Sequence, residues 1–404
     1  MAVFAYTAKG PDGKKVESVI RASDKGAAQA ELKKKNLTVA SIIEQKTAKK
    51  SSFFGPPRPR VKTKDIAVMT RQLSTMISAG IPLLESLEIL HEQASDPGFK
   101  LTLDKIIERV RAGSDFSTAL SEHKLFTKIY VNMIKAGEAS GQLDVILQRL
   151  ADYMESVEEL KREIKAAMTY PVISLVLILT ITIGLVVGIV PKFQTIFIQM
   201  EMKELPLPTE ILLKISDALR DQYLIVGGVA IVVIVGFFMY IKTKPGMRQW
   251  HWVMLHAPVF GPLFRKVAIS RFSRTFATLI QSGVPMLGAL DIVAATAGNV
   301  LVEEAVLKAK DAVSKGETLG DPLTATRVFP PMVTRMISIG EKTGALEKLL
   351  MKIAEFYDGE VRATVKALTS LIEPLLIATM GFIVGFIVLS IFLPIIKIQQ
   401  SLSK

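Results

Sequence analysis

The sequence contains no cysteine among its 404 residues. This absence excludes disulfide bridges, thiolate metal sites and thiol catalysis together. Histidine is scarce, and none of the four histidines forms the His-Glu-x-x-His spacing of a zinc protease. Glu341-Lys342-Thr343 is similar to the end of a phosphate-binding loop, but the preceding glycine frame is missing. We therefore expect no catalytic residue, no metal, no cofactor and no enzymatic activity.

The N-terminus also lacks the apolar stretch of a signal peptide, so none is expected. Apolar residues are abundant elsewhere, at 50% of the chain. They concentrate in three runs, 172–190, 224–241 and 375–396, each close to the roughly 20 residues that cross a bilayer. Buried soluble helices are usually shorter and amphipathic, which makes them the weaker alternative. No carboxylate or histidine lies inside the runs, which argues against an intramembrane protease or a proton-coupled carrier.

The net charge of +12 is distributed unevenly. Residues 1–170 and 242–374 have more Lys and Arg than Asp and Glu, whereas residues 191–223 do not. The positive-inside rule then places the two basic regions in the cytoplasm and residues 191–223 on the outer side of the membrane. The third crossing leaves the tail, 397–404, on the outer side as well. Because the basic bias follows this topology and no stacking-aromatic motif accompanies it, nucleic acid is not an expected partner.

A long internal repeat organises the chain. Gly137-Glu138-Ala139-Ser140-Gly141-Gln142-Leu143 recurs as Gly340-Glu341-Lys342-Thr343-Gly344-Ala345-Leu346, an offset of 203 positions. The same offset joins further pairs without insertion or deletion: Arg71 with Arg274, Gly80 with Gly283, Pro82 with Pro285, Gly113 with Gly316, Phe126 with Phe329, Pro171 with Pro374 and Pro191 with Pro394. We infer the duplication of a whole domain.

The resulting prediction is an all-α polytopic membrane protein with two duplicated cytoplasmic helical bundles, at 65–170 and 268–373. Residues 1–45 predict a small α/β module, with strands at Val3–Ala8, Val16–Ala22 and Val39–Ile43 and a helix from Ser23 through Leu32. Residues 46–64 form a basic, proline-rich linker, either a solvated tether or a segment attracted to anionic lipid headgroups. In the periplasmic loop, Pro206 precedes an amphipathic helix over Ile211–Leu219, which could touch other proteins at the outer surface.

Two repeated turns are candidate coupling or interaction sites. Gly80 and Gly283 each end a helix, and Pro82 and Pro285 each restart one. The second turn is the Gly-Glu-x-x-Gly loop, where Glu138 or Glu341 precedes a helix N-terminus and Gly141 or Gly344 relaxes the backbone. Both turns have a purely structural interpretation. The alternative is that a partner recognises them or that the acidic loops bind a cation at an interface.

The helix that follows each Gly-Glu loop is predicted to continue into the membrane. Leu143, Leu147, Leu150, Met154 and Val157 show the heptad spacing of a packed helical seam. We expect kinks where Pro171 and Pro374 interrupt these helices at the membrane entry. Gly184, Gly188, Gly381 and Gly385 allow close helix approach, either among the chain's own helices or in a dimer.

These features together resemble the inner-membrane platform proteins of type IV pilus assembly and the similar F-type platform proteins of type II secretion. The resemblance rests on the duplicated Gly-x-Pro hairpin, the duplicated Gly-Glu-x-x-Gly-x-Leu loop, the two membrane-entry prolines and the three crossings. It extends to the N-terminal pattern Phe4-x-Tyr6-x-Ala8 with Gly13, Ala22, Ala27 and Leu32. The sequence departs from that pattern at Asn36, where a glycine is expected.

The resemblance implies six-helix bundles, a place in the bacterial inner membrane and a platform that couples a cytoplasmic pilus assembly or retraction ATPase to pilin subunits. It also implies alignment proteins of the inner membrane as partners and a homo-oligomer, with a dimer favoured. A type II secretion platform is the alternative. A small-solute transporter is a further alternative of another class, which three helices without midplane polar residues disfavour.

Overall fold

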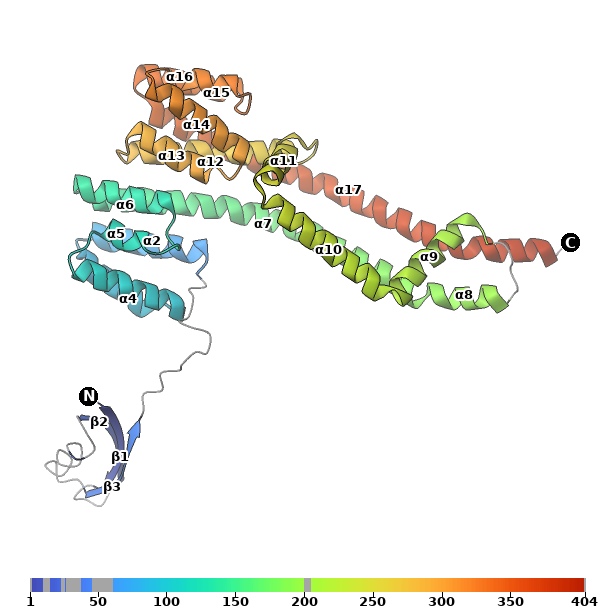
Figure 1. The fold of residues 1–404 in the computed structure, drawn as a ribbon, viewed down its shortest axis with the longest axis horizontal. Coiled ribbons are helices and arrows are strands. Elements are labelled where there is room, and N and C mark those ends of the chain that lie inside the picture. The colour runs from blue at the N-terminus through green and yellow to red at the C-terminus, as the bar shows by residue number, and fades with distance from the viewer. Residues whose placement is uncertain are drawn as a thin grey trace. The chain divides into compact units, whose positions relative to one another are not determined.

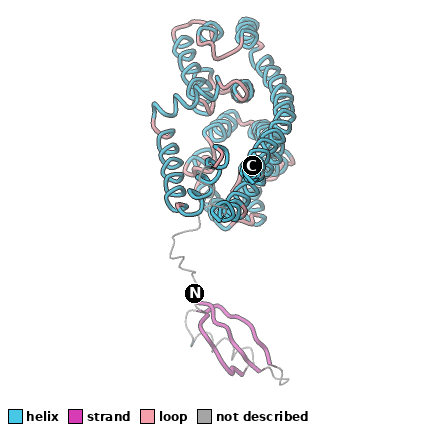
Figure 2. Tube along the Cα trace, turned by 90° about the vertical axis from the view of Figure 1, so that its right-hand side faces the viewer, coloured by secondary structure: helices cyan, strands magenta, loops and turns pink. Residues whose placement is uncertain are grey.

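A computed structural model describes residues 2–9, 15–22, 26, 38–45, 61–199 and 205–402. The chain forms two compact units, one comprising residues 1–60 with 95–99 and the other comprising residues 61–94 with 100–404. Figure 1 and Figure 2 show strands only in the first unit and helices throughout the second. Each unit is described by itself below.

The N-terminal unit contains an antiparallel sheet. Among its described residues, β1 (Ala2–Lys9) lies between β2 (Lys15–Ala22) and β3 (Thr38–Gln45), with a register shift at Thr7/Ala8 on the β3 side. The strands coincide with the three predicted from alternation. The helix predicted from Ser23 through Leu32 lies outside the described residues, apart from Gly26, so the α/β character of this module stays a prediction.

The first bundle consists of helices α2–α7. They are α2 (Thr63–Ser78), α3 (Leu83–Gln93), α4 (Pro97–Arg111), α5 (Phe116–Ser121), α6 (Lys128–Ser140) and the start of α7 (Leu143–Gly188). The second bundle repeats this order with α12 (Gly261–Gln281), α13 (Met286–Thr296), α14 (Val300–Ser314), α15 (Gly320–Ala325), α16 (Pro331–Thr343) and the start of α17 (Leu346–Leu402). The short helices α5 and α15 were not foreseen.

The two bundles have equivalent cores. Five fully buried positions of the first bundle recur, one by one, at the repeat offset in the second: Leu73 with Phe276, Leu87 with Leu290, Leu103 with Val306, Tyr130 with Val333 and Leu147 with Leu350. Each helix buries one face, as its 3.6-residue periodicity requires. The predicted fold of two duplicated helical bundles is therefore confirmed.

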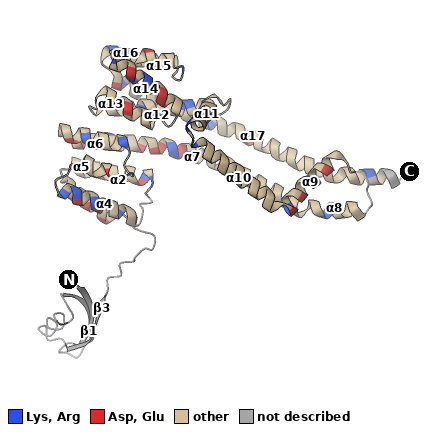
Figure 3. Cartoon of the chain, in the orientation of Figure 1, with Lys and Arg blue, Asp and Glu red and all other residues tan. Residues whose placement is uncertain are grey.

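Three helices of the described chain are long and apolar enough to cross a membrane: α7, α10 (Tyr223–Ile241) and α17. Charged residues, coloured blue and red in Figure 3, are frequent in the bundles, whereas the sequence of α10 includes none. The crossings are joined by α8 (Val190–Gln199) and α9 (Leu207–Asp221) on one side and by α11 (Lys244–His256) on the other. No side chain of α10 is buried, so most of the circumference of α10 faces its surroundings.

Helices α7 and α17 meet near both ends of their apolar stretches. On the bundle side, Val361 and Val365 of α17 and Leu263 of α12 form a core against which Leu160 and Ile164 of α7 pack. On the opposite side, the core consists of residues from α7, α8, α9 and α17: Val186, Val190, Leu212, Leu213 and Ile387. Between these two cores, residues 172–185 and 369–386 include no buried side chain.

Candidate functional site

The Gly-x-Pro turns are built from the backbone. Gly80 and Gly283 have φ of 85° and 79°, a left-handed conformation that side chains disfavour. The N–H of Ile81 donates to the carbonyl of Met76 over 3.0 Å, which closes the end of α2 in a Schellman arrangement, and the second repeat has the equivalent bond. Pro82 lies at the N-cap of α3 rather than inside the first turn, because its ψ of 145° is extended. Pro285 has the same place before α13.

The Gly-Glu-x-x-Gly motif is mostly helical, which corrects the predicted loop. Glu138 lies in the last turn of α6, and only Gly141, with φ of 67°, leaves the helix as its C-cap. Gly344 ends α16 in the same way, with φ of 71°. Gly137 is not a point of backbone freedom either. It lets two helices approach, because a Cβ there would lie 3.0 Å from the Cβ of Ile146 on α7.

The two motif carboxylates cap helices other than the ones predicted. Glu138 accepts hydrogen bonds from the backbone N–H groups of Phe116, at 2.5 Å, and Ser117, at 3.1 Å. Glu341 accepts from the N–H of Leu319 at 2.8 Å. The carboxylates therefore serve the N-termini of α5 and α15, where unpaired N–H groups favour a negative charge. The prediction had the right chemistry but placed it at α7 and α17, since it lacked the two short helices.

An arginine in each repeat ties the first bundle helix to the long helix, and the sequence analysis assigned it no role. In the first repeat, Arg71 of α2 binds both carboxylate oxygens of Glu155, at 2.7 and 2.6 Å, and also contacts Asp152. The pKa of Arg71 is raised, chiefly by its hydrogen bond to Glu155. In the second repeat, Arg274 of α12 pairs with Asp358 of α17. We call these pairs the arginine clamps.

The repeat offset contained the signal for the clamps. It places Arg71 opposite Arg274 and Glu155 opposite Asp358, so opposite charges recur on two helices that must pack in both copies. Complementary charges at the repeat offset therefore predict contacts between the helices that carry them.

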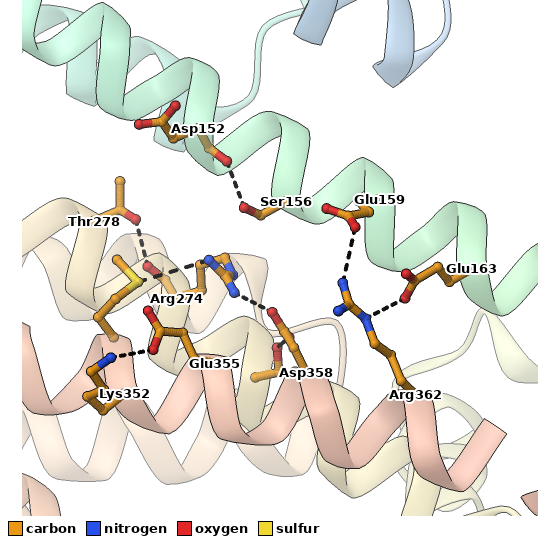
Figure 4. Close-up of polar contacts among 12 residues, drawn as sticks. Asp152, Ser156, Glu159, Glu163, Arg274, Thr278, Lys352, Glu355, Asp358 and Arg362 are labelled. Atoms are coloured by element: carbon orange, nitrogen blue, oxygen red, sulfur yellow. Dashed lines mark hydrogen bonds and ion pairs between the residues drawn. The ribbon is translucent and has the colours of Figure 1, made fainter. Parts of the chain in front are cut away.

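The two repeats join along α7, in what we call the helix seam. Arg362 of α17 donates to Glu163 at 2.7 Å and to Glu159 at 3.2 Å, and Glu163 raises the pKa of Arg362 (Figure 4). Farther along, the hydroxyls of Tyr153 on α7 and Thr275 on α12 lie 3.2 Å apart. Burial raises the pKa of Tyr153. Of the five predicted seam positions, Leu147, Leu150 and Met154 are buried, whereas Leu143 and Val157 are half-buried.

Two grooves flank the helix seam. One, of about 410 Å³, lies between α7 and α12, and the other, of about 350 Å³, lies between α7 and α17. Leu160 and Ile164 line both, with lysine and arginine side chains at the margins. The described residues around them hold no group of three or more His, Cys, Asp and Glu side chains that could bind a metal. The grooves therefore offer apolar contact surface and positive charge.

All four repeated turns lie at the membrane-distal ends of the bundles. Leu143 begins α7 roughly 42 Å from Pro171, at about 1.5 Å per residue, and α17 has the same length before Pro374. Helices α2 and α12 run antiparallel to their long helices, as the arginine clamps and the bond from Ser74 to Gln148 show. Gly80 and Gly283 thus end up beside Gly141 and Gly344. The structure brings these candidate residues together in each repeat, far from the prolines.

The membrane-entry prolines lie inside continuous helices. Helix α7 runs through Pro171, and α17 runs through Pro374 and Pro394. The four membrane glycines do not mark close contacts within the described chain. A Cβ at Gly184, Gly188, Gly381 or Gly385 would meet no other atom within 4 Å. Of the two interpretations of these glycines, packing among the chain's own helices is therefore not observed.

Helix α9, which contains the predicted amphipathic segment, packs between the crossing helices. The Thr209 hydroxyl of α9 donates to the carbonyl of Ser390 at 2.6 Å, and the Ser216 hydroxyl donates to that of Val186 at 2.8 Å. Leu212 and Leu213 are buried beside these bonds. Helix α9 thus fastens α17 to α7, and only its outer face, with Ile211 and Ile215, stays open.

His251 and Trp250 of α11 contact different parts of the chain. The Trp250 ring packs edge-on against Phe237 of α10 at a centroid distance of 5.4 Å. The Nδ1 atom of His251 accepts a hydrogen bond from the N–H of Val300 at 3.0 Å, at the start of α14. Burial lowers the pKa of His251. The histidine therefore fastens α11 to the second bundle.

The fold and the seam define a class of protein: a polytopic membrane protein in which a duplicated helical bundle continues into paired membrane helices. The profile described as "Type II secretion system (T2SS), protein F" matches residues 69–191 and 272–394, two spans separated by the repeat offset. The profile of the "Type II secretion system protein F, N-terminal domain" matches residues 1–43. The chain belongs to the type II secretion system protein F family.

Members of both branches of this family are similar to the chain over its full length. The chain is 43% identical to the type IV pilus assembly protein PilC of Thermus thermophilus, covering 100% of both proteins. It is 41% identical to the PilC of Myxococcus xanthus, covering 99% of this chain and 96% of the relative. It is 32% identical to the type II secretion system protein F of Vibrio cholerae, again covering 100% of both. The resemblance stated from the sequence is confirmed.

Proposed function

We propose that this protein is a non-enzymatic inner-membrane platform of a type IV pilus machine. In this role it couples a cytoplasmic assembly or retraction ATPase to the insertion or extraction of pilin. The observation that carries the proposal is the continuity of α7 and α17, each of which is part of a bundle core and of a membrane crossing. The names of the two PilC relatives favour the pilus over secretion.

The proposal assigns the bundles to the cytoplasm. The N-terminus is then cytoplasmic, the C-terminus is periplasmic, and α9 faces the periplasm, where alignment proteins would meet it. Reporter fusions at residue 50 and near residue 300 should report cytoplasm, and fusions near residue 205 and after residue 400 should report the periplasm. Any other pattern would separate the bundles from a cytoplasmic motor and contradict the platform role.

The membrane-distal turns are the proposed contact with the motor ATPase. They lie at the ends of the two bundles that are remote from the bilayer, and Ala139 and Lys342 expose their side chains beside Gly141 and Gly344. Full-length protein in nanodiscs should bind the cognate ATPase, and Ala139→Arg and Lys342→Glu should each weaken binding severalfold. Arg162→Glu, which changes an exposed charge near the membrane, is the matched control. Equal binding by all three variants would remove the turns from the proposal.

The membrane-entry prolines are the proposed points at which bundle movement passes into the bilayer. A proline inside a helix removes one backbone hydrogen bond and costs about 3 kcal/mol or more, so a bend at that position is the expected use. Pro171→Ala and Pro374→Ala should leave the protein inserted at normal levels and slow filament extension. Wild-type extension at normal protein levels would contradict coupling, whereas reduced protein levels with normal extension per molecule would indicate a packing role.

Pilus and secretion roles are separated by complementation. We expect the gene to restore pili to a strain that lacks its pilus platform and to leave protein secretion unrestored in a strain that lacks its secretion platform. The contact with pilin is proposed for the exposed faces of α7, α10 and α17. Failure to restore pili together with restored secretion would reassign the protein to the secretion branch.

A further inference from the structure

The two repeats are packed head to tail. Helix α12 of the second repeat packs on α7 of the first, through Tyr153 with Thr275 and through a hydrogen bond from Arg149 to the carbonyl of Gln281. The repeat offset maps Tyr153 to Phe356 on α17 and Thr275 to Gln72 on α2. If the repeats were related by a two-fold axis, α2 would pack on α17 in the same way. Within the described residues, no comparable packing joins these two helices.

The surfaces left over by this arrangement are open. Tyr153 is 9% exposed, whereas its counterpart Phe356 is 51% exposed. The acidic partner in the arginine clamp of the second repeat is 13% exposed, whereas Glu155 in the clamp of the first is 48% exposed. The reason for the difference lies in the neighbour, since α7 lines the groove over Arg274 with Ser156 and Val157. In the part of the chain that is described, nothing equivalent covers Arg71.

We propose that a second copy of this chain covers the first repeat, with its α17 packed on α2 as α7 packs on α12. The contact would bring Phe356 of one copy to Gln72 of the other. A second copy fits because each repeat presents both halves of the interface, and only one half of each is used inside the chain. A head-to-tail contact repeats until it closes into a ring. The smallest ring of this kind is a dimer with four repeats.

The register of the helix seam permits this repetition inside a bilayer. Arg362 contacts Glu159, its own counterpart at the repeat offset, and Glu163, one turn farther along, so the axial shift between α7 and α17 is less than about one helical turn. A second copy added by the same relation therefore lies at nearly the same depth in the bilayer. A shift of a helical turn or more would lift the membrane helices of the next copy out of the hydrocarbon. The inference rests on the proposed platform function only because the family resemblance implies a homo-oligomer. It adds the surface through which the copies meet, α17 of one copy on α2 of the other.

Thiol cross-linking with a short bismaleimide tests the contact, because the natural chain has no cysteine. A reagent with some length is needed because the residues meet through the ends of their side chains, whereas a disulfide bridges only backbones within about 7 Å. Membranes containing full-length Gln72→Cys/Phe356→Cys should give dimer-sized species when the reagent is added. A mixture of the two single variants in one membrane should do the same. Each single variant alone should give severalfold less, since a head-to-tail contact does not bring a residue to its own copy. Tyr153→Cys/Thr275→Cys is the positive control and should cross-link within one chain without a dimer.

A pair containing Leu307→Cys with Gln72→Cys controls for random collision, since Leu307 is exposed on α14. Phe356→Ala should lower the oligomer mass measured in detergent while the helical content stays unchanged. Self-cross-linking of the Phe356→Cys variant at the level of the pair would overturn the head-to-tail contact. A monomer mass for the natural chain would overturn it too. So would an oligomer in which the Gln72→Cys/Phe356→Cys variant does not cross-link. Neither result bears on binding of the ATPase, which is measured separately.

Discussion

The arginine clamps of the two repeats join the same pair of helices and differ in how much water reaches them. The side chains of Arg274 and Asp358 are 14% and 13% exposed, whereas those of Arg71 and Glu155 are 30% and 48% exposed. Local sequence does not cause the difference, because both clamps use an arginine and a carboxylate at the same repeat positions. The neighbouring helix causes it. The same ion pair in two copies of a repeat can thus differ in stability, because the neighbouring helices differ.

The largest expected effect comes from breaking the covered clamp. Arg274→Met leaves the carboxylate of Asp358 mostly buried with only the Ser270 hydroxyl donating to it, a loss of roughly 3 kcal/mol, at the lower end of buried ion pairs. Arg71→Met breaks a clamp that water reaches, with an expected loss of roughly 0–1 kcal/mol. Urea unfolding of the full-length protein in detergent, followed by circular dichroism, measures both, and Arg335→Met is the exposed control. Equal losses in the free energy of unfolding would show that the packing of α7 beside Arg274 does not strengthen the second clamp.

The second comparison concerns the motif glycines. A Cβ at Gly340 would lie 2.8 Å from the Cα of Leu346, which is backbone, whereas one at Gly137 meets the Ile146 side chain at 3.0 Å. Overpacking typically costs about 1–3 kcal/mol, so Gly340→Ala should fall near the top of that range and Gly137→Ala near the bottom. Gly288→Ala, with room for a methyl group, is the control. Thermal unfolding gives the order, and a larger effect at Gly137 would contradict it.

The third comparison concerns the motif carboxylates. Glu138 accepts two backbone hydrogen bonds and Glu341 accepts one. Removing a helix cap costs about 0.5–2 kcal/mol, so Glu138→Ala should approach the upper value and Glu341→Ala should stay near about 1 kcal/mol. Glu317→Ala on the open surface is the control. Hydrogen exchange of α5 and α15 locates each loss, and unchanged exchange in both would rule out the capping role.

The smallest expected effect is a pH dependence confined to the second repeat. Because burial lowers the pKa of His251, the unfolded chain binds the proton more tightly than the folded one. The bond from Val300 is then fully present above the ordinary histidine pKa of about 6.5 and is lost as the pH falls through the lower folded value. When the pH is lowered from 7.5 to 5.5, backbone amide hydrogen exchange at the start of α14 should become faster. The expected loss of local stability is about 0.5–1 kcal/mol.

His251→Gln should flatten the pH dependence, and His256→Gln, on the exposed side of α11, should not. The first repeat has no helix equivalent to α11 among its described residues, so exchange at the start of α4 should stay constant over the same range. An equal pH response in both repeats would point to a source other than His251.

Most of the fold was accessible from the sequence, because apolar runs and a repeat without gaps are strong signals. The membrane crossings, the bundle helices and the left-handed conformations at Gly80 and Gly141 followed from composition and spacing. The short helix α5 did not, because six residues, Phe116–Ser121, are too few for a periodicity to register. Without α5, the prediction assigned Glu138 to the N-terminus of the wrong helix, α7. The true partners of Glu138 are 21 and 22 residues away, and tertiary packing alone brings them together.

The helix seam was only half predictable. The heptad spacing from Leu143 to Val157 predicts that one face of α7 is packed against another helix. The spacing does not show whether that helix belongs to the same repeat or to the other one. The pairing of Arg362 with Glu163 connects residues 199 positions apart, beyond the reach of any local pattern. The helix α11 was also missed, since residues 242–267 mix aromatic and basic side chains without a clear apolar stripe.

The fastening of α7 and α17 at both ends has a mechanical consequence. The helix seam holds them at the bundles, and α9 holds them through Thr209 and Ser216 at the other end, while residues 172–185 and 369–386 include no buried side chain. The two helices are therefore joined to each other at both ends of their apolar stretches. A rotation of one bundle cannot be absorbed by sliding α7 past α17, because both joints would have to break. It must either bend α7 and α17, which are weakest at Pro171 and Pro374, or rotate α9.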